Sequence, residues 1–73
     1  MGAKNLDEIQ FNAAMEHIVV ALKERGYDPY AQLTGYITEN DPIYVTSHNG
    51  ARELISTLDI GAVKNFVENM DKE

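Results

Sequence analysis

The sequence predicts a small, mainly α-helical domain of four helices with one short extended segment. Apolar residues recur at spacings of three and four along most of the chain, and β-favouring residues are gathered in one run, Ile43 to Thr46. The length of 73 residues allows a single domain, covering residues 1–73. An apolar core of this size is only marginally sufficient for folding, so self-association is also expected.

The first helix is expected over residues 6–25, where apolar side chains share one face. Asn5 and Glu8 fit a reciprocal N-terminal cap, and Gly26 can adopt the left-handed conformation that ends a helix. The apolar face comprises Phe11, Met15, Ile18, Val19 and Leu22.

A short second helix is expected to begin at Asp28-Pro29. Asp28 can accept hydrogen bonds from free backbone N–H groups, and Pro29 has a φ suited to the first helical position. Gly35 lowers the stability of this helix by about 1 kcal/mol relative to alanine, or it lets another backbone approach closely. The apolar side comprises Tyr30, Leu33, Tyr36 and Ile37.

Residues 39–42 then predict a turn, and Ile43 to Thr46 follow as the extended segment. A single strand has no partner within one copy of the chain. The segment is therefore either extended and solvated, or it pairs with the same segment of a second copy around a two-fold axis. We slightly favour the pairing across a homodimer.

The pair Asn49-Gly50 is a hairpin signal, but the apolar spacing that follows it is helical and favours a third helix. Ser47 or Asn49 is expected to cap this helix, and Asp59 is expected to cap a fourth. Residues 1–4 and 71–73 are expected to fray. The apolar faces comprise Ala51, Leu54, Ile55 and Leu58 in the third helix, and Ile60, Val63, Val67 and Met70 in the fourth.

Charge and composition argue against several functions. Six basic and twelve acidic side chains give a net charge of −6, which opposes binding to nucleic acid. The chain has no cysteine, and its two histidines, His17 and His48, lie far apart in the sequence, so no metal or cofactor is expected. No catalytic motif is found, and no enzymatic activity is predicted. No apolar stretch is long enough for a bilayer, so we expect a soluble, cytoplasmic protein without membrane insertion.

All four tyrosines lie between residues 27 and 44, and tyrosine is favoured at protein interfaces. An equally good alternative is that these rings fill the edge of a small core with their hydroxyl groups in water. The candidate interface residues are Tyr30, Tyr36, Ile43, Tyr44 and Val45.

Two other functions compete with an interaction protein. The second helix, the central turn and the third helix could form a helix-turn-helix nucleic-acid binder, although Arg52 is the one cation there that could neutralise a phosphate. The other alternative is a small enzyme or ligand pocket around Tyr44, Ser47 and His48, which would bind an anion. The simpler interpretation of that polar group is that it satisfies backbone N–H groups at a helix start.

A set of residues between positions 26 and 52 also matches a known family pattern in register and without a gap. It comprises Gly26, Tyr27, Pro29, Gln32, Gly35, Tyr36, Asp41, Pro42, Tyr44, Ser47, His48, Ala51 and Arg52. On these residues, the segment from Ala21 to Leu58 resembles the IreB-like family, also called YrzL-like, of small proteins from low-GC Gram-positive bacteria.

The resemblance implies a homodimeric, mostly helical, non-enzymatic regulator. It also implies an association with a membrane-bound Ser/Thr kinase that carries PASTA repeats, or with its phosphatase, in envelope-stress signalling. Two regions depart from the family pattern. The family's phosphoacceptor threonines lie in an N-terminal tail, whereas this chain has no Ser or Thr before Thr34, so its phosphorylation site is not predicted. Residues Asp59 to Val63 replace a more charged stretch.

Overall fold

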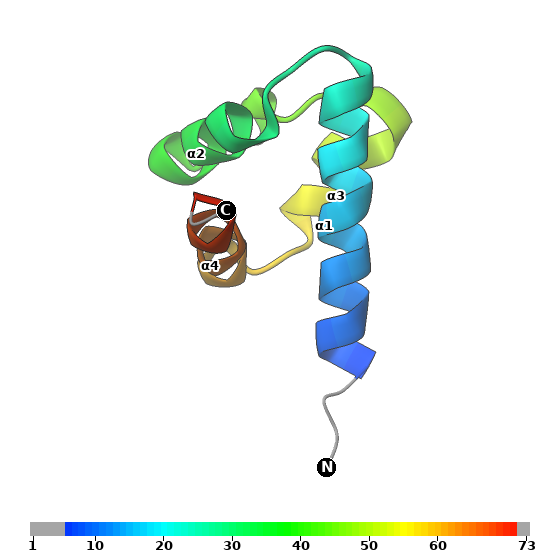
Figure 1. The fold of residues 1–73 in the computed structure, drawn as a ribbon, viewed down its shortest axis with the longest axis vertical. Coiled ribbons are helices and arrows are strands. Elements are labelled where there is room, and N and C mark those ends of the chain that lie inside the picture. Colours follow the sequence, from blue (N-terminus) through cyan, green and yellow to red (C-terminus); the bar gives the residue numbers. More distant parts are fainter. Residues whose placement is uncertain (1–5, 72–73) are drawn as a thin grey trace.

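The computed structural model describes residues 6–71, which form four α-helices and two short 3₁₀ turns and contain no strand (Figure 1). This confirms the small all-α class predicted from the spacing of apolar residues. The elements in chain order are α1 (Leu6–Glu24), α2 (Pro29–Glu39), η1 (Pro42–Tyr44), η2 (His48–Gly50), α3 (Ala51–Ser56) and α4 (Ile60–Asp71).

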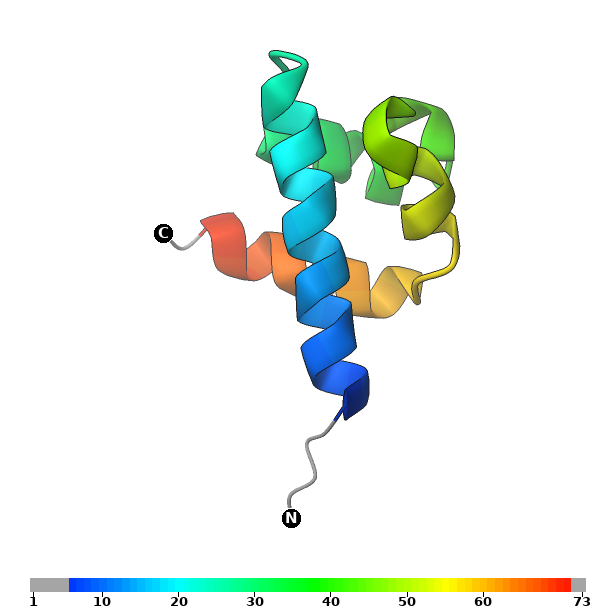
Figure 2. The same cartoon turned by 90° about the vertical axis from the view of Figure 1, so that its right-hand side faces the viewer.

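The helices pack as two pairs, α1 with α3 and α2 with α4. Helix α1 is the longest and stands along the long axis of the molecule, with α2 and α4 together on one side of it (Figure 1). Turned by 90°, the molecule shows α4 passing across α1 (Figure 2). The turn η1 contacts both α2 and α3, so it lies where the two pairs meet.

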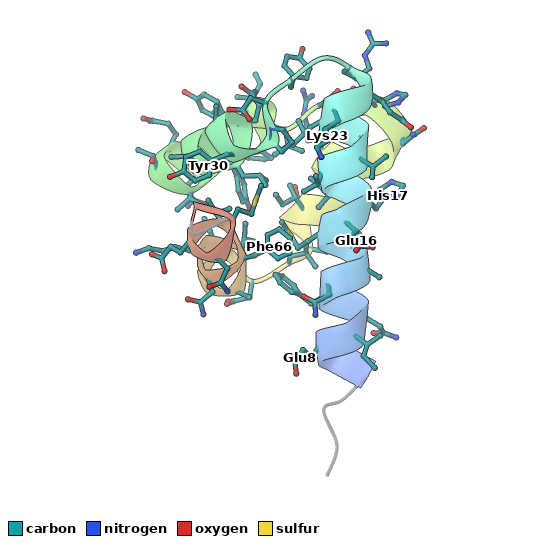
Figure 3. The ribbon with its side chains drawn as sticks, viewed as in Figure 1. Glu8, Glu16, His17, Lys23, Tyr30 and Phe66 are labelled. Carbon is teal, nitrogen blue, oxygen red and sulfur yellow. The ribbon has the colours of Figure 1, made fainter. Side chains whose placement is uncertain are left out.

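The core lies between the helix pairs and receives side chains from every α-helix. The aromatic rings of Phe11 and Phe66 meet edge to face, with centroids 6.3 Å apart and an interplanar angle of 77°. Phe66 lies in the space between α4 and α1, so this contact joins the two pairs (Figure 3). The core cluster comprises Met15, Ile18, Ala21, Leu22, Leu33, Tyr36, Val45, Ala51, Ile55, Val63 and Val67.

Helix α1 ends as predicted, one residue earlier than its expected boundary. Gly26 has a φ of 84°, and its N–H donates to the carbonyl of Lys23. The N–H of Tyr27 donates to the carbonyl of Leu22, which completes the two-bond pattern of a left-handed helix terminus. The cap predicted for α4 is also confirmed, because Asp59 Oδ2 accepts a 3.0 Å hydrogen bond from the N–H of Ala62.

Two predicted caps are wrong. Asp28 occupies the N-cap position of α2 in an extended conformation, but its side chain makes no capping hydrogen bond. The N-cap of α3 is Gly50, not Ser47 or Asn49. Asn49 and Gly50 both have positive φ, 54° and 73°, and form a tight turn in which the N–H of Ala51 bonds to the carbonyl of His48.

The hairpin signal at these two residues thus specifies a real left-handed turn, but the turn leads into a helix because residues from Ala51 onward have helical apolar spacing. The Asn5 cap and the fraying expected at residues 1–4, 72 and 73 lie outside the described residues. Asp71 is the last residue of α4.

Candidate interaction site

The candidate site is the connection between α2 and α3, residues 40–50, which we call the α2–α3 linker. It begins at Asn40, which ends α2 in a left-handed conformation (φ 55°) that asparagine tolerates better than most residues. Asp41 Oδ1 then accepts a hydrogen bond from the N–H of Ile43 at 3.1 Å. Pro42 supplies the first residue of η1. Local side-chain chemistry therefore turns the chain immediately after α2.

The predicted extended segment is corrected by this turn. Ile43 and Tyr44 belong to η1. Val45, which follows them in the predicted run, has extended backbone angles (φ −107°, ψ 129°). The N–H groups of Tyr44 and Val45 donate to the carbonyls of Asp41 and Pro42.

The carbonyls of the same segment also have partners within the chain. Gln32 Nε2 donates to the carbonyl of Tyr44 at 2.8 Å, and Arg52 Nε donates to the carbonyl of Val45 at 2.9 Å. These bonds use the backbone groups that strand pairing with a second copy would need. The structure therefore gives no basis for strand pairing through Tyr44 and Val45, because the N–H and carbonyl groups of both residues have partners within the chain.

The five candidate interface residues divide into exposed and buried sets. Ile43 is 65% exposed, and Tyr30 and Tyr44 are 39% and 38% exposed. Val45 is fully buried and Tyr36 is 6% exposed, so both belong to the core of the single chain. The Val45 side chain therefore fixes the linker to the core, whereas Ile43, two residues earlier, faces solvent.

Gly35 is what allows Tyr44 to lie against α2. A Cβ atom built on Gly35 would be 2.8 Å from Cδ1 of the Tyr44 ring. The close approach predicted for this glycine is therefore made by a tyrosine side chain, where the sequence suggested another backbone.

The second half of the linker is held by α1. Nε2 of His48 lies 2.9 Å from Oε1 of Glu24, and Asn49 Nδ2 donates to the same oxygen at 3.3 Å. His17 Nε2 lies 2.8 Å from the carbonyl oxygen of Asn49. Because carboxylate and carbonyl oxygens only accept, each histidine donates through Nε2.

These contacts bring together two histidines that are far apart in the sequence. Figure 3 shows His17 on the side of α1 that is turned away from α2 and α4. Thr46 Oγ1 adds a local bond by accepting from the N–H of His48 at 3.2 Å. No pattern in the sequence indicated the anchoring roles of Glu24 and His17, because their contacts span more than 20 residues and follow no periodic spacing.

The residues of the family pattern gather around the linker and the turn before α2. Gly26 and Tyr27 close α1, Pro29 is buried at the start of α2, and Ala51 is buried at the start of α3. Tyr36 is a buried core residue of α2. The remaining eight form or hold the linker, namely Gln32, Gly35, Asp41, Pro42, Tyr44, Ser47, His48 and Arg52.

A groove of about 380 Å³ separates α2 from α4 and was not anticipated from the sequence. Tyr30 lies on its α2 side (Figure 3), and Lys64 and Glu68 line it from α4. Thr34 also lines it, and its Oγ1 atom is buried without a hydrogen-bond partner.

The geometry does not favour the two competing functions. Arg52, the cation on which a helix-turn-helix interpretation depends, is partly buried and donates to a carbonyl within the chain. No hydrogen bond joins the side chains of Tyr44, Ser47 and His48. Within residues 6–71, no group of three or more acidic, histidine or cysteine side chains is placed to hold a metal ion. The helices that are described include none long and apolar enough to cross a membrane.

The fold and the linker define a small all-α domain whose α2–α3 connection is held by hydrogen bonds within the chain. A family model described as IreB regulatory phosphoprotein matches residues 1–70 of the 73-residue chain. The chain therefore belongs to the IreB family, as the pattern from Gly26 to Arg52 indicated, and a regulatory role follows from that membership.

Proposed function

We propose that this chain is a non-enzymatic regulator that acts as a homodimer through the α2–α3 linker. One observation carries the proposal: Ile43 and Tyr44 are 65% and 38% exposed on a turn whose backbone is held by hydrogen bonds within the chain. Exposed apolar side chains on an ordered turn lose little conformational entropy when they bind, which favours their use in an interface.

A second copy of the chain is the partner that fits the size of the domain. A chain of this length buries only about 60% of the surface that its unfolded form exposes, so association adds a large fraction to its core. The Ile43 side chain supplies an apolar contact, and Tyr44 supplies apolar area with a polar tip, a combination enriched at interfaces. In a two-fold dimer each side chain would be used twice.

We further propose that the dimer acts in the pathway of a Ser/Thr kinase with PASTA repeats, as the kinase's substrate or as a partner of the kinase or its phosphatase. The description of the family as a regulatory phosphoprotein supports phosphorylation, and the resemblance of the linker residues supports the kinase class. This proposal implies a cytoplasmic location, because a kinase uses ATP and ATP is a cytoplasmic substrate.

Sedimentation equilibrium at micromolar concentration tests the dimer. We compare the wild-type protein with Ile43→Ser and with a matched variant, Val20→Ser, which replaces an aliphatic residue that is 51% exposed on α1. Ile43→Ser should weaken dimerisation about tenfold or more, which corresponds to about 1.4 kcal/mol. Val20→Ser should leave it unchanged. A wild-type protein that is folded and strictly monomeric would rule out the dimer, and a larger effect of Val20→Ser would move the interface to α1.

A further inference from the structure

The position that carries a phosphate can be sought among the six Ser and Thr hydroxyl groups of this chain. A protein kinase needs a hydroxyl that reaches its active site and a backbone that can lie extended in its cleft. Hydroxyls that are buried, or that hold the local structure, satisfy this need poorly. The six residues are Thr34, Thr38, Thr46, Ser47, Ser56 and Thr57.

Four of the six hydroxyl groups are buried or hydrogen bonded. Thr34 Oγ1 is buried beside the α2–α4 groove. Thr46 Oγ1 accepts from a backbone N–H at the start of η2. The hydroxyls of the other two donate to carbonyls at the end of α3, namely Ser56 to Arg52 at 2.9 Å and Thr57 to Leu54 at 2.7 Å.

Thr38 and Ser47 remain, and both are exposed. Thr38 lies in the last turn of α2, so a kinase would have to unwind the helix to reach it. A phosphate there would also meet the negative end of the helix dipole and the carboxylate of Glu39. Ser47 lies outside the α-helices, at the residue before η2. Its backbone has φ −81° and ψ −3°, one hydrogen bond from the N–H of Gly50 holds its carbonyl, and its side chain makes no capping hydrogen bond.

We propose that Ser47 is the phosphoacceptor of this chain, an inference that rests on the proposed role as a kinase substrate. The Ser47 Oγ atom attacks the γ-phosphorus of Mg·ATP bound to a Ser/Thr kinase. A bond forms between Oγ and phosphorus, the bond from phosphorus to the β–γ bridging oxygen breaks, and ADP leaves. The hydroxyl proton passes to a carboxylate of the kinase.

The position of Ser47 gives the phosphate a structural consequence. It adds a charge of about −1.5 to −2 next to His48, whose Nε2 is bonded to Glu24. The phosphate repels the Glu24 carboxylate and competes with it for the imidazole N–H. Phosphorylation of Ser47 therefore loosens the hold of α1 on η2, while α4 lies elsewhere in the fold.

Phosphorylation of the full chain in vitro tests the assignment. The wild-type protein, Ser47→Ala and Thr38→Val are incubated with Mg·ATP and the catalytic domain of a PASTA-type kinase, and intact mass and fragment spectra locate the phosphate. We expect one phosphate on the wild-type protein and on Thr38→Val, and none on Ser47→Ala. Circular dichroism should show that Ser47→Ala is folded, since the Ser47 side chain makes no bond that the fold requires.

The outcomes separate this inference from the proposed function. A phosphate that persists on Ser47→Ala, or that maps to another residue, overturns the Ser47 assignment and leaves the kinase link intact. A wild-type protein that takes no phosphate overturns both the Ser47 assignment and the kinase link. The dimer is tested separately by sedimentation equilibrium. In the phosphorylated protein, NMR signals of Glu24, His48 and Asn49 should shift more than those of α4. Equal shifts would rule out the loosened contact.

Discussion

Among single residues, Gly35 is the position where replacement by alanine should destabilise the fold, although helix propensity alone predicts that it stabilises it. Alanine in place of an interior glycine normally stabilises a helix by about 1 kcal/mol. Here the added Cβ would lie 2.8 Å from the Tyr44 ring, so the ring must move off α2. We expect Gly35→Ala to lower the free energy of unfolding by about 1 to 3 kcal/mol, the range typical of overpacked sites. Urea denaturation followed by circular dichroism measures this change.

The background variant Tyr44→Ala is the control for that prediction. With the ring removed, Gly35→Ala should recover its helix-forming advantage and raise the free energy of unfolding by about 1 kcal/mol. The difference between the two backgrounds gives the coupling between Gly35 and Tyr44. If Gly35→Ala has the same effect in both backgrounds, the ring does not limit the space at Gly35.

Val45 and Ile43 form a second pair of single-residue tests, because the turn points one inward and the other outward. Val45 is completely buried, whereas Ile43 is 65% exposed. Val45→Ala should lower the free energy of unfolding by about 2 kcal/mol, from lost apolar burial and the cavity that remains. Ile43→Ala should change the stability of the folded monomer by less than about 0.5 kcal/mol, as at most surface positions. If denaturation of the monomer shows similar losses in the free energy of unfolding for both variants, Val45 and Ile43 do not differ in burial as described.

The helix ends provide a matched comparison between two aspartates at N-cap positions. Asp59 Oδ2 accepts from the N–H of Ala62, but Asp28 makes no side-chain capping bond. Asp59→Ala should therefore cost about 1 kcal/mol, the usual value for losing a cap. Asp28→Ala should be nearly neutral. Thermal unfolding of both variants checks the ranking, and a larger loss for Asp28→Ala would contradict it.

The helices themselves could be predicted from the sequence because their signals are local. Apolar spacing located α1 and α4, and Gly26 and Asp59 marked two of their ends correctly. The pair Asn49-Gly50 was also informative, since both residues do take left-handed angles. Whether a strand or a helix follows this turn depended on the apolar spacing downstream, which is helical and correctly predicted α3.

The linker could not be predicted in the same way, because contacts from distant parts of the chain determine its conformation. The β-favouring run at Ile43 suggested a strand, but Asp41 caps a turn, and Gln32 and Arg52 supply the hydrogen-bond donors that a second strand would have supplied. Propensity was overridden by tertiary hydrogen bonding. Glu24 and His17 were missed for the same reason.

In the molecule as a whole, the packing leaves apolar side chains exposed although the core is small. The helices share one cluster of buried apolar side chains, while Ile43 on η1 and Val20 on α1 stay exposed. A dimer that covers one of these side chains would couple association to folding. Folding of each subunit would then depend on the concentration of the protein.

This coupling predicts a melting temperature that rises with concentration. For a dimer that unfolds to two chains, a hundredfold increase in concentration stabilises each folded subunit by about 1.4 kcal/mol, half of the mass-action term per dimer. In a domain of this size that corresponds to a rise in Tm of about 5 °C or more. Calorimetry at protein concentrations between about 1 and about 100 μM measures this rise in Tm, because mass action shifts the equilibrium between folded dimer and unfolded chains over that range. Ile43→Ser should have a lower Tm than the wild-type protein at each concentration, whereas Val20→Ser should keep the wild-type values, because only Ile43 lies on the proposed interface. A constant Tm for the wild-type protein would mean that its folded state does not depend on a second copy.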